Sequence, residues 1–171
     1  MIISLTGFMG CGKSSVGRRL SELLCCRFMD LDSVIEERTG RSIPEIFASD
    51  GEAAFRDIEK NTLKDVFLKT HLTPDTLVLS LGGGTVMTPE CADLIHEKTT
   101  CIYLKASLET LVSHLESQTS DRPLLSGTNL RDRISELMAL RSSTYEKTAH
   151  VIIDTDGKTV DCIAEEILSH L

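Results

Sequence analysis

Residues 2–18 read IISLTGFMGCGKSSVGR, and this stretch decides how the rest of the chain is interpreted. The apolar start predicts a short strand, and a helical pattern begins at the end of the following loop. Between them, residues 7–14 match the spacing GxxxxGK[ST], in which glycines let successive backbone N–H groups point at phosphate oxygens. The dipole of the following helix favours the same anion. The stretch predicts a nucleoside triphosphate site, and the residues expected at the phosphates are Gly10, Cys11, Gly12, Lys13, Ser14 and Ser15.

Charged and metal-binding groups are expected on both sides of this loop. Lys13 supplies a mobile positive charge for the outer phosphates, and the Ser14 hydroxyl is a ligand for Mg²⁺. Asp30 and Asp32 follow the next predicted strand, so one of them can hold the metal through water while the other accepts hydrogen bonds from a hydroxyl group. The alternative is a solvated strand end in which Asp32 caps a helix.

Composition indicates an ordinary globular chain. The 171 residues are 41% hydrophobic and 26% charged, which suits a single domain over residues 1–171. A net charge of −8 argues against nucleic acid as the main partner, so a few placed cations must meet the phosphates. No apolar run is long enough to span a bilayer and no basic leader is seen, so we expect a cytoplasmic protein without a membrane partner, and a monomer.

The six cysteines show no CxxC pair and no zinc-ligand spacing. We interpret them as reduced, mostly buried small hydrophobic residues. Cys11 differs because it lies inside the phosphate loop, where N–H dipoles favour its thiolate. We therefore expect a reactive thiol there, whose modification blocks nucleotide binding.

Strands and helices are expected to alternate, which is typical of an α/β protein with a parallel sheet covered on both faces. Ligands of such sheets gather at the carboxyl ends of the strands. The polar stretch at residues 118–129 has the composition of a mobile loop. Strands are expected at residues 2–5, 26–32, 77–81, 100–104 and 151–154. Helices are expected at residues 13–24, 33–38, 52–69, 130–148 and 159–171, with further helices that start at Ser42, Thr88 and Ser107.

The triple glycine Gly82, Gly83 and Gly84 follows a predicted buried strand. Three glycines together indicate backbone that a ligand approaches closely, although a tight turn is the alternative. Two arginines lie on predicted helices, where surface solvation is the simple explanation. Arg56 would then form a surface ion pair with Glu59 at i,i+3.

Taken together, the motifs GFMGCGKSSVG, FMDLDSVIEERTGRSIPEIFASDGEAAFRDIE, LSLGGGTV, DRPLL and ALRSSTYEKTA resemble the shikimate kinase family. They occur in order and cover essentially the whole chain. The resemblance implies a three-layer αβα fold of the nucleoside-monophosphate-kinase-like group, with a five-stranded parallel sheet of order 2-3-1-4-5. It also implies a lid near residues 118–129 and a substrate-binding region near residues 32–61.

The resemblance further implies ATP-dependent phosphorylation of the 3-hydroxyl of shikimate, in chorismate and aromatic amino-acid biosynthesis. Asp32 would bind the substrate hydroxyls and act as base or orienter, and Asp30 would hold Mg²⁺ through water beside Ser14. The shikimate carboxylate and ring hydroxyls would be held by Arg56 and Arg141, together with the backbone of the triple glycine. Glu59 would then orient the guanidinium of Arg56.

On the nucleotide side, the resemblance implies that Arg122 is the lid arginine that neutralises the transferring phosphoryl group. Many family members carry another arginine several residues earlier, near the adenine. Here that region reads SHLESQTSD, so Lys158 is taken as an alternative contact.

Two other functions fit the phosphate loop. A related small-molecule kinase would act on gluconate, adenylyl sulfate or a nucleotide, but the LDSVIEERTGRSI run and the triple glycine argue against it. A regulatory nucleotide-binding protein would need a guanine-specifying motif such as NKxD, which the sequence lacks.

Overall fold

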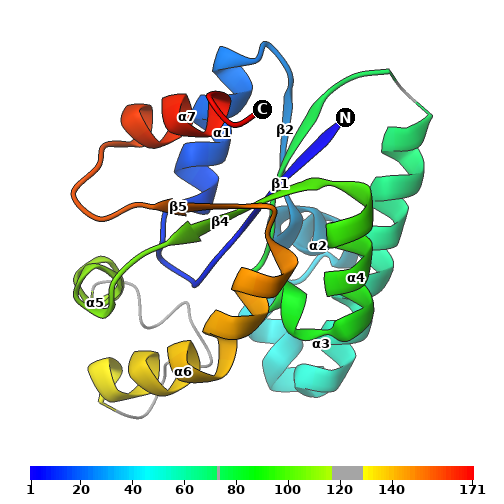
Figure 1. The fold of residues 1–171 in the computed structure, drawn as a ribbon. Helices are drawn as coiled ribbons and strands as arrows, with labels where there is room; N and C mark the ends of the chain where they lie inside the picture. Colours follow the sequence, from blue (N-terminus) through cyan, green and yellow to red (C-terminus); the bar gives the residue numbers. More distant parts are fainter. Residues whose placement is uncertain (73, 117–128) are drawn as a thin grey trace.

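The structure is a computed structural model that describes residues 1–72, 74–116 and 129–171. Its centre is a five-stranded parallel sheet in the order β2-β3-β1-β4-β5, as the family resemblance implies. Helices cover both faces of this sheet (Figure 1). The strands are β1 (Ile2–Thr6), β2 (Arg27–Asp30), β3 (Leu77–Ser80), β4 (Thr100–Lys105) and β5 (Val151–Asp154).

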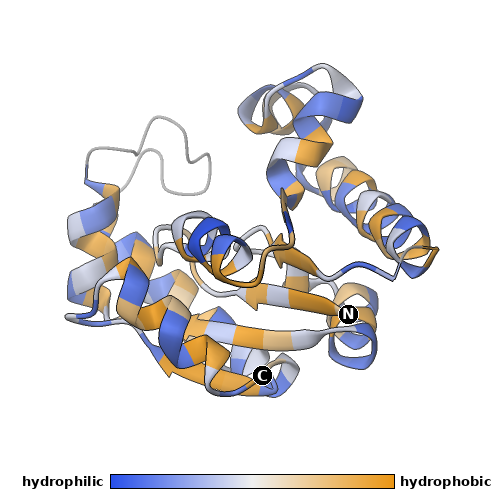
Figure 2. Ribbon diagram, turned by 90° about the horizontal axis from the view of Figure 1, so that it is seen from above, coloured by the Kyte–Doolittle hydropathy of each residue, from blue (hydrophilic) through white to orange (hydrophobic). Residues whose placement is uncertain are grey.

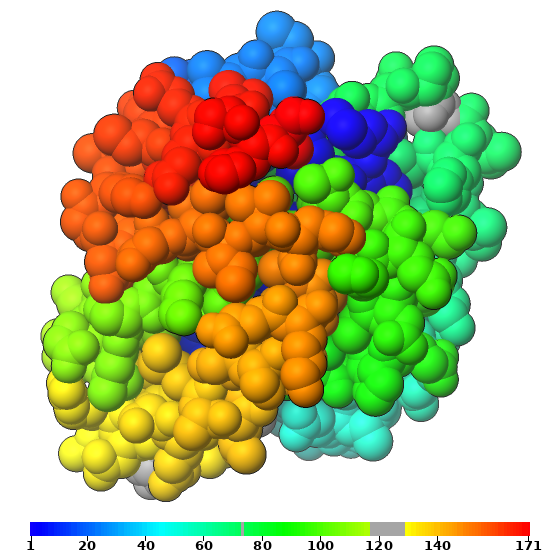
Figure 3. Space-filling view, in the orientation of Figure 1, coloured from blue at the N-terminus to red at the C-terminus, as the bar shows by residue number. Residues whose placement is uncertain are grey.

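Burial follows the position of each strand in the sheet. Every residue of β1 and β3 is buried, because central parallel strands are covered on both faces and read as continuous apolar runs. The register places Ile3 between Val78 and Thr100. β5 is an edge strand, and its residues reach the surface between α7 (Val160–Leu168) and α6 (Leu130–Thr148) (Figure 3). The central strands are coloured mainly as hydrophobic (Figure 2).

The helices form two layers. α1 packs against α7 on one face of the sheet, and α4 packs against α6 and α3 on the other (Figure 1). No helix in the part of the chain that the structure describes is long and apolar enough to cross a membrane. The remaining helical elements are α1 (Lys13–Leu23), α2 (Leu31–Thr39), α3 (Ile43–His71), the 3-10 helix η1 (Thr85–Met87), α4 (Pro89–Lys98) and α5 (Leu108–Leu115).

The junction between β2 and α2 differs from the prediction. The strand stops at Asp30, and α2 begins at the next residue, two positions earlier than expected. The Asp30 side chain accepts hydrogen bonds from the backbone N–H groups of Asp32 and Ser33. Asp30 is therefore the N-cap, and the placement of Asp32 at a strand end or cap is wrong. Capping moves Asp32 into the first turn of the helix.

The start of α3 confirms the expected capping box between Ser42 and Glu45, with a proline in the first turn. The predicted break at Gly51 is also present, as a glycine with φ 85° and ψ 172° inside the helix. Only glycine adopts this conformation readily. Gly40, at φ 67°, precedes the same segment, and Arg41 forms an ion pair of 2.8 Å with Asp50 across it.

Candidate active site

The phosphate loop connects β1 to α1 and turns through glycines in left-handed conformations. Gly10 and Gly12 have φ values of 82° and 93°, and Gly12 is the N-cap of α1. The Lys13 ammonium donates hydrogen bonds to the carbonyl oxygens of Gly7 and Phe8, at 2.9 and 3.0 Å. The loop thus holds its one lysine at the positive end of the α1 dipole, as an anion site requires.

Three oxygen-bearing side chains meet beside this loop. The Ser14 hydroxyl donates to Asp30 at 2.6 Å, and the Ser80 hydroxyl lies 3.5 Å from the same Ser14 oxygen. They come from α1, β2 and β3, which are brought together by the pairing of β2 with β3. Mg²⁺ prefers oxygen ligands, with one or two carboxylates or hydroxyls besides phosphate and water. The donor set therefore fits the predicted magnesium ion.

A pocket of about 460 Å³ opens over the phosphate loop. It runs across the carboxyl end of β1, with residues of β2 and β3 on one side and residues of α5 and α7 on the other. Its lining residues are Met9, Gly10, Gly12, Lys13, Ser14, Ser15, Asp30, Asp32, Ser80, Leu81, Gly83, His114 and Val160.

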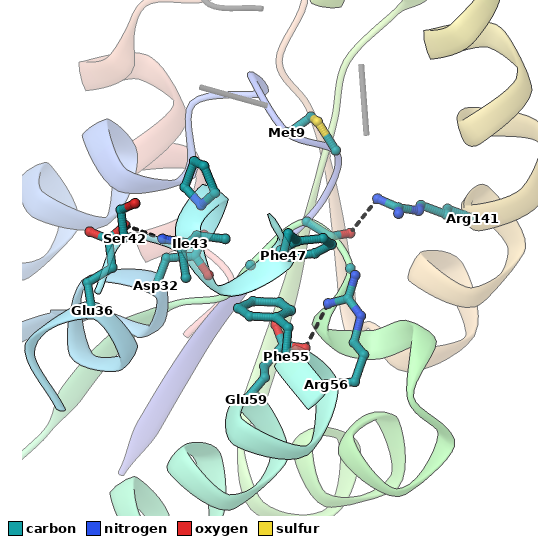
Figure 4. A pocket seen from close by; sticks show the side chains of 14 residues that line it. Met9, Asp32, Glu36, Ser42, Ile43, Phe47, Phe55, Arg56, Glu59 and Arg141 are labelled. Atoms are coloured by element: carbon teal, nitrogen blue, oxygen red, sulfur yellow. Dashed lines mark hydrogen bonds and ion pairs between the residues drawn. The ribbon is translucent and has the colours of Figure 1, made fainter. Parts of the chain in front are cut away.

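A second pocket, of about 400 Å³, lies next to the first. Figure 4 shows Arg56 and Arg141 on one side of it, with the rings of Phe47 and Phe55 between them and Asp32. It thus offers two planar cations, an apolar wall and a carboxylate. Its lining residues are Met9, Asp32, Glu36, Ser42, Ile43, Pro44, Phe47, Phe55, Arg56, Glu59, Gly82, Gly83, Gly84 and Arg141.

The triple glycine gives each of three neighbours room to approach. A Cβ on Gly82 would lie 2.9 Å from a carboxylate oxygen of Asp32, and one on Gly83 would lie 3.1 Å from the backbone nitrogen of Met9. A Cβ on Gly84 would overlap the guanidinium of Arg56. None of the three has a positive φ. Glycine is therefore needed at these positions because a side chain would collide with a neighbour, and not because of the backbone conformation.

Arg56 and Glu59 form a partly buried ion pair, in which the carboxylate is fully buried, rather than the surface pair considered from their spacing. Arg56 Nη1 donates to Glu59 Oε2 at 2.8 Å, and the Thr85 hydroxyl donates to Oε1 at 2.6 Å. The Glu59 side chain is 1% exposed. Both carboxylate oxygens are therefore satisfied, which a buried charge requires, and the guanidinium is fixed at the pocket wall.

Arg141 and Tyr145 lie one turn apart on α6 and meet the same backbone atom. Arg141 Nη1 donates to the carbonyl oxygen of Gly83 at 3.4 Å, and the Tyr145 hydroxyl donates to the same oxygen. Burial raises the pKa of Tyr145, so its phenol stays a neutral donor. The Tyr103 ring stacks on it at 5.1 Å, and burial raises the pKa of Tyr103 to about 12. The guanidinium of Arg141 is therefore held against the Gly83 carbonyl, whose position Tyr145 fixes.

Both pockets share three residues, Met9, Asp32 and Gly83. They are therefore two ends of one cavity, in which Asp32 is the ionisable group common to both. A group bound in the second pocket would meet the outer end of a triphosphate bound in the first. This is the arrangement that phosphoryl transfer between two substrates requires.

Two residues predicted to bind the nucleotide, Cys11 and Lys158, do not line the pocket over the phosphate loop. Cys11 is 4% exposed and its backbone N–H donates to the Phe8 carbonyl, so the thiol that we expect to be reactive is buried within the loop. Lys158 pairs with Glu166 at 2.6 Å and does not line the pocket over the phosphate loop. Arg122 and most of the predicted lid lie outside the described residues.

Several lining residues escaped the sequence analysis. His114 lines the pocket over the phosphate loop, and its Nδ1 lies 2.8 Å from the carbonyl oxygen of Gly10. Met9 lies within the phosphate loop and lines both pockets. Glu36 accepts a hydrogen bond from the Ile43 N–H at 2.8 Å. The only sequence feature that could have indicated this lining is the apolar and aromatic start of α3, which forms a wall of the second pocket.

Comparison with known proteins agrees with this geometry. A family model described as shikimate kinase matches residues 9–171. A shikimate kinase of Thermus thermophilus is 44% identical over 169 residues, which cover 99% of this chain and 89% of that protein. A shikimate kinase of Chlorobium chlorochromatii is 39% identical over 174 residues, with 97% and 88% of the two chains covered.

Solved structures place the chain in the same group. A shikimate kinase from Acinetobacter baumannii in complex with shikimate has a TM-score of 0.92 at 32% identity, and 99% of this chain and 91% of that chain are covered. A gluconokinase from Sinorhizobium meliloti reaches a TM-score of 0.57 at 17% identity, with 98% and 89% covered, which shows the fold alone. The chain therefore belongs to the shikimate kinase family.

Proposed function

We propose that this chain carries out the reaction for which its family is named, the ATP-dependent phosphorylation of shikimate at its 3-hydroxyl. The observation that carries the proposal is the pair of pockets joined at Asp32, one over the phosphate loop and one with two planar cations. The product would be shikimate 3-phosphate, an intermediate on the route to chorismate and aromatic amino acids.

The acceptor pocket matches the chemistry of a small hydroxylated acid. Arg56 and Arg141 face it with guanidinium groups, which bind a carboxylate through two parallel hydrogen bonds. Phe47 and Phe55 give the carbon ring an apolar surface, and the glycine backbone allows it to approach closely. We assign acceptor binding to these groups, to Gly82, Gly83 and Gly84, and to the region near residues 32–61.

We assign the phosphates of ATP to the loop N–H groups and Lys13. Mg²⁺ would be held by Ser14 directly and by Asp30 through water, and it would supply positive charge beside the phosphate oxygens. Gly10, Gly12 and Ser15 line the same pocket, which supports their assignment. The role of Cys11 in this set is limited because its N–H is bonded within the loop.

For the transfer step we assign Asp32 as the residue that orients the acceptor hydroxyl and accepts its proton. Its position at the junction of the pockets supports this role. Arg122 is proposed to stabilise the transferring phosphoryl group, as part of a lid near residues 118–129 that excludes water. Lys158 remains a proposed contact of the nucleotide. We further propose that residues 1–171 form a single domain that works in the cytoplasm as a monomer.

The test is acceptor-dependent ADP release, measured with shikimate, with gluconate and with no acceptor, followed by phosphorus NMR of the product. We expect rapid release with shikimate only, and a phosphate ester on the 3-hydroxyl. Equal rates with shikimate and gluconate would favour a broader small-molecule kinase. Tight ATP binding without turnover on either acceptor would favour a regulatory nucleotide-binding protein.

A further inference from the structure

His114 stands at the end of α5, far in sequence from the loop it contacts. Its Nδ1 lies 2.8 Å from the carbonyl oxygen of Gly10. A carbonyl oxygen only accepts hydrogen bonds, so Nδ1 must carry the proton. In the neutral ring Nε2 then keeps its lone pair, and within the described ranges no residue forms a hydrogen bond with Nε2. The ring therefore has one nitrogen bonded to the phosphate loop and one that, among the described residues, has no hydrogen-bond partner.

The contact between α5 and the phosphate loop is tightly packed. A Cβ on Gly10 would lie 2.8 Å from Leu115 Cδ2, so Gly10 has room for no side chain. Leu115 is fully buried, while its neighbour His114 is exposed and lines the phosphate pocket. Two successive residues of α5 thus hold one residue of the loop. A solvated histidine at a helix end would need neither contact.

The two ends of the phosphate pocket are lined by different parts of the fold. The metal pair Ser14 and Asp30, with Ser80, lies on the β2–β3 side of β1, where the acceptor pocket also begins. His114 and Val160 come from α5 and α7, which follow β4 and β5 on the opposite side (Figure 1). The outer phosphate must lie beside the acceptor hydroxyl. The nucleoside end of the substrate must therefore extend toward His114.

We propose that His114 recognises the nucleotide: Nδ1 holds the Gly10 carbonyl, and Nε2 accepts a hydrogen bond from the nucleoside part of ATP. The matching donors on a nucleoside are a ribose hydroxyl and the amino group of the base. This inference rests on the proposed kinase function, and it adds a second nucleotide contact to the one proposed for Lys158.

Three substitutions separate the two ring nitrogens. His114→Asn keeps a donor near the position of Nδ1 but has no group at Nε2, whereas His114→Gln keeps a polar group near Nε2 and loses the Nδ1 donor. His114→Ala removes both. His170→Asn is the matched control, because His170 is an exposed histidine in the tail after α7. Circular dichroism of each variant confirms that the fold is kept.

The measurement is calorimetric binding, in Mg²⁺ and without acceptor, of ADP and of inorganic triphosphate, which has no nucleoside. We expect His114→Asn to weaken ADP binding about three- to tenfold, which is the range for one hydrogen bond. The affinity for inorganic triphosphate should stay unchanged. His114→Ala should weaken the binding of both ADP and inorganic triphosphate, and His170→Asn should weaken the binding of neither.

ADP binding to His114→Asn at the wild-type affinity would overturn the proposal. Equal losses for ADP and inorganic triphosphate in that variant would also overturn it, because His114 would then only support the loop. Since no acceptor is present, these outcomes are independent of whether shikimate is the substrate. Failure of the proposed function would appear separately, as the absence of shikimate-dependent ADP release.

Discussion

Gly84→Ala should impair acceptor binding by displacing Arg56, although Gly84 itself carries no functional group. A Cβ at this position would overlap Arg56 Nη2 and lie 2.8 Å from Cζ, so the guanidinium must move by more than the 0.6 Å that would bring Cζ alone to an ordinary contact of 3.4 Å. The Cβ meets the far end of a side chain rather than backbone, so the fold should tolerate the change as long as the ion pair of Arg56 with Glu59 is kept. The cost should fall instead on the hydrogen bonds between Arg56 and the acceptor carboxylate.

The expected loss follows from the value of those bonds. A hydrogen bond to a charged group contributes about 1.5–3 kcal/mol, and roughly 1.4 kcal/mol corresponds to a factor of ten in rate. We therefore expect kcat/KM for shikimate to fall about 10- to 100-fold in Gly84→Ala, with the KM for ATP unchanged. Steady-state kinetics with each substrate varied in turn would measure both values.

A double-mutant cycle identifies the route of the effect. If Gly84→Ala acts by displacing the guanidinium, it should add almost nothing in a chain that already carries Arg56→Ala. Additive losses in the double variant would refute this reasoning and would instead assign a direct contact between the Gly84 backbone and the acceptor. A large drop in thermal stability of Gly84→Ala would also refute it, because the side chain would then not be free to yield.

The remaining predictions concern single side chains. Arg141→Lys should raise the KM for shikimate roughly tenfold and leave ATP binding intact, since a point charge cannot form a bidentate contact; unchanged shikimate saturation would contradict this. Asp32→Asn should lower kcat about 10²-fold if it accepts the proton, and near wild-type turnover would leave it no such role. Asp30→Asn should raise the Mg²⁺ concentration for half-maximal activity about tenfold, measured by metal titration, while an unchanged titration would exclude it from the metal site. Burial and the neighbouring His96 lower the pKa of His150 in the folded state. The stability that this neutral histidine contributes is therefore full above its unfolded pKa of about 6.5 and falls as the pH drops below that value. Urea denaturation should show this loss in the wild-type protein, and a His150→Gln variant should not show it.

Local patterns predicted most of the architecture. The phosphate loop, the apolar strand runs and the Ser42 capping box depend on neighbours within a few residues, so their structure is encoded where it forms. The Asp30–Asp32 pair shows the limit of this reasoning. Either carboxylate can cap the next helix, and the choice depends on where β2 stops pairing with β3. Strand order came from the family resemblance, because the pairing of distant strands leaves no local pattern.

Parts of the site were hidden from the sequence because they depend on contacts between distant segments. The i,i+3 spacing of Arg56 and Glu59 is the same on a surface and in a core, and only the packing of Thr85 against Glu59 distinguishes the two. The contact of His114 with Gly10 spans 104 positions. The inward direction of Cys11 is likewise set by the turn of the loop rather than by its composition.

The short segment between Gly40 and Gly51 has a consequence for protein engineering. It supplies Ile43 and Phe47 to the acceptor pocket, and its two ends are tied together by the ion pair between Arg41 and Asp50. Both flanking glycines adopt conformations that release the segment from the direction of the neighbouring helices. Residues 41–50 therefore form a separable segment. Replacing it with another segment of equal length could reshape the second pocket for a different acid. Ser14, Asp30, the phosphate loop and both arginines lie outside this segment and would remain in place.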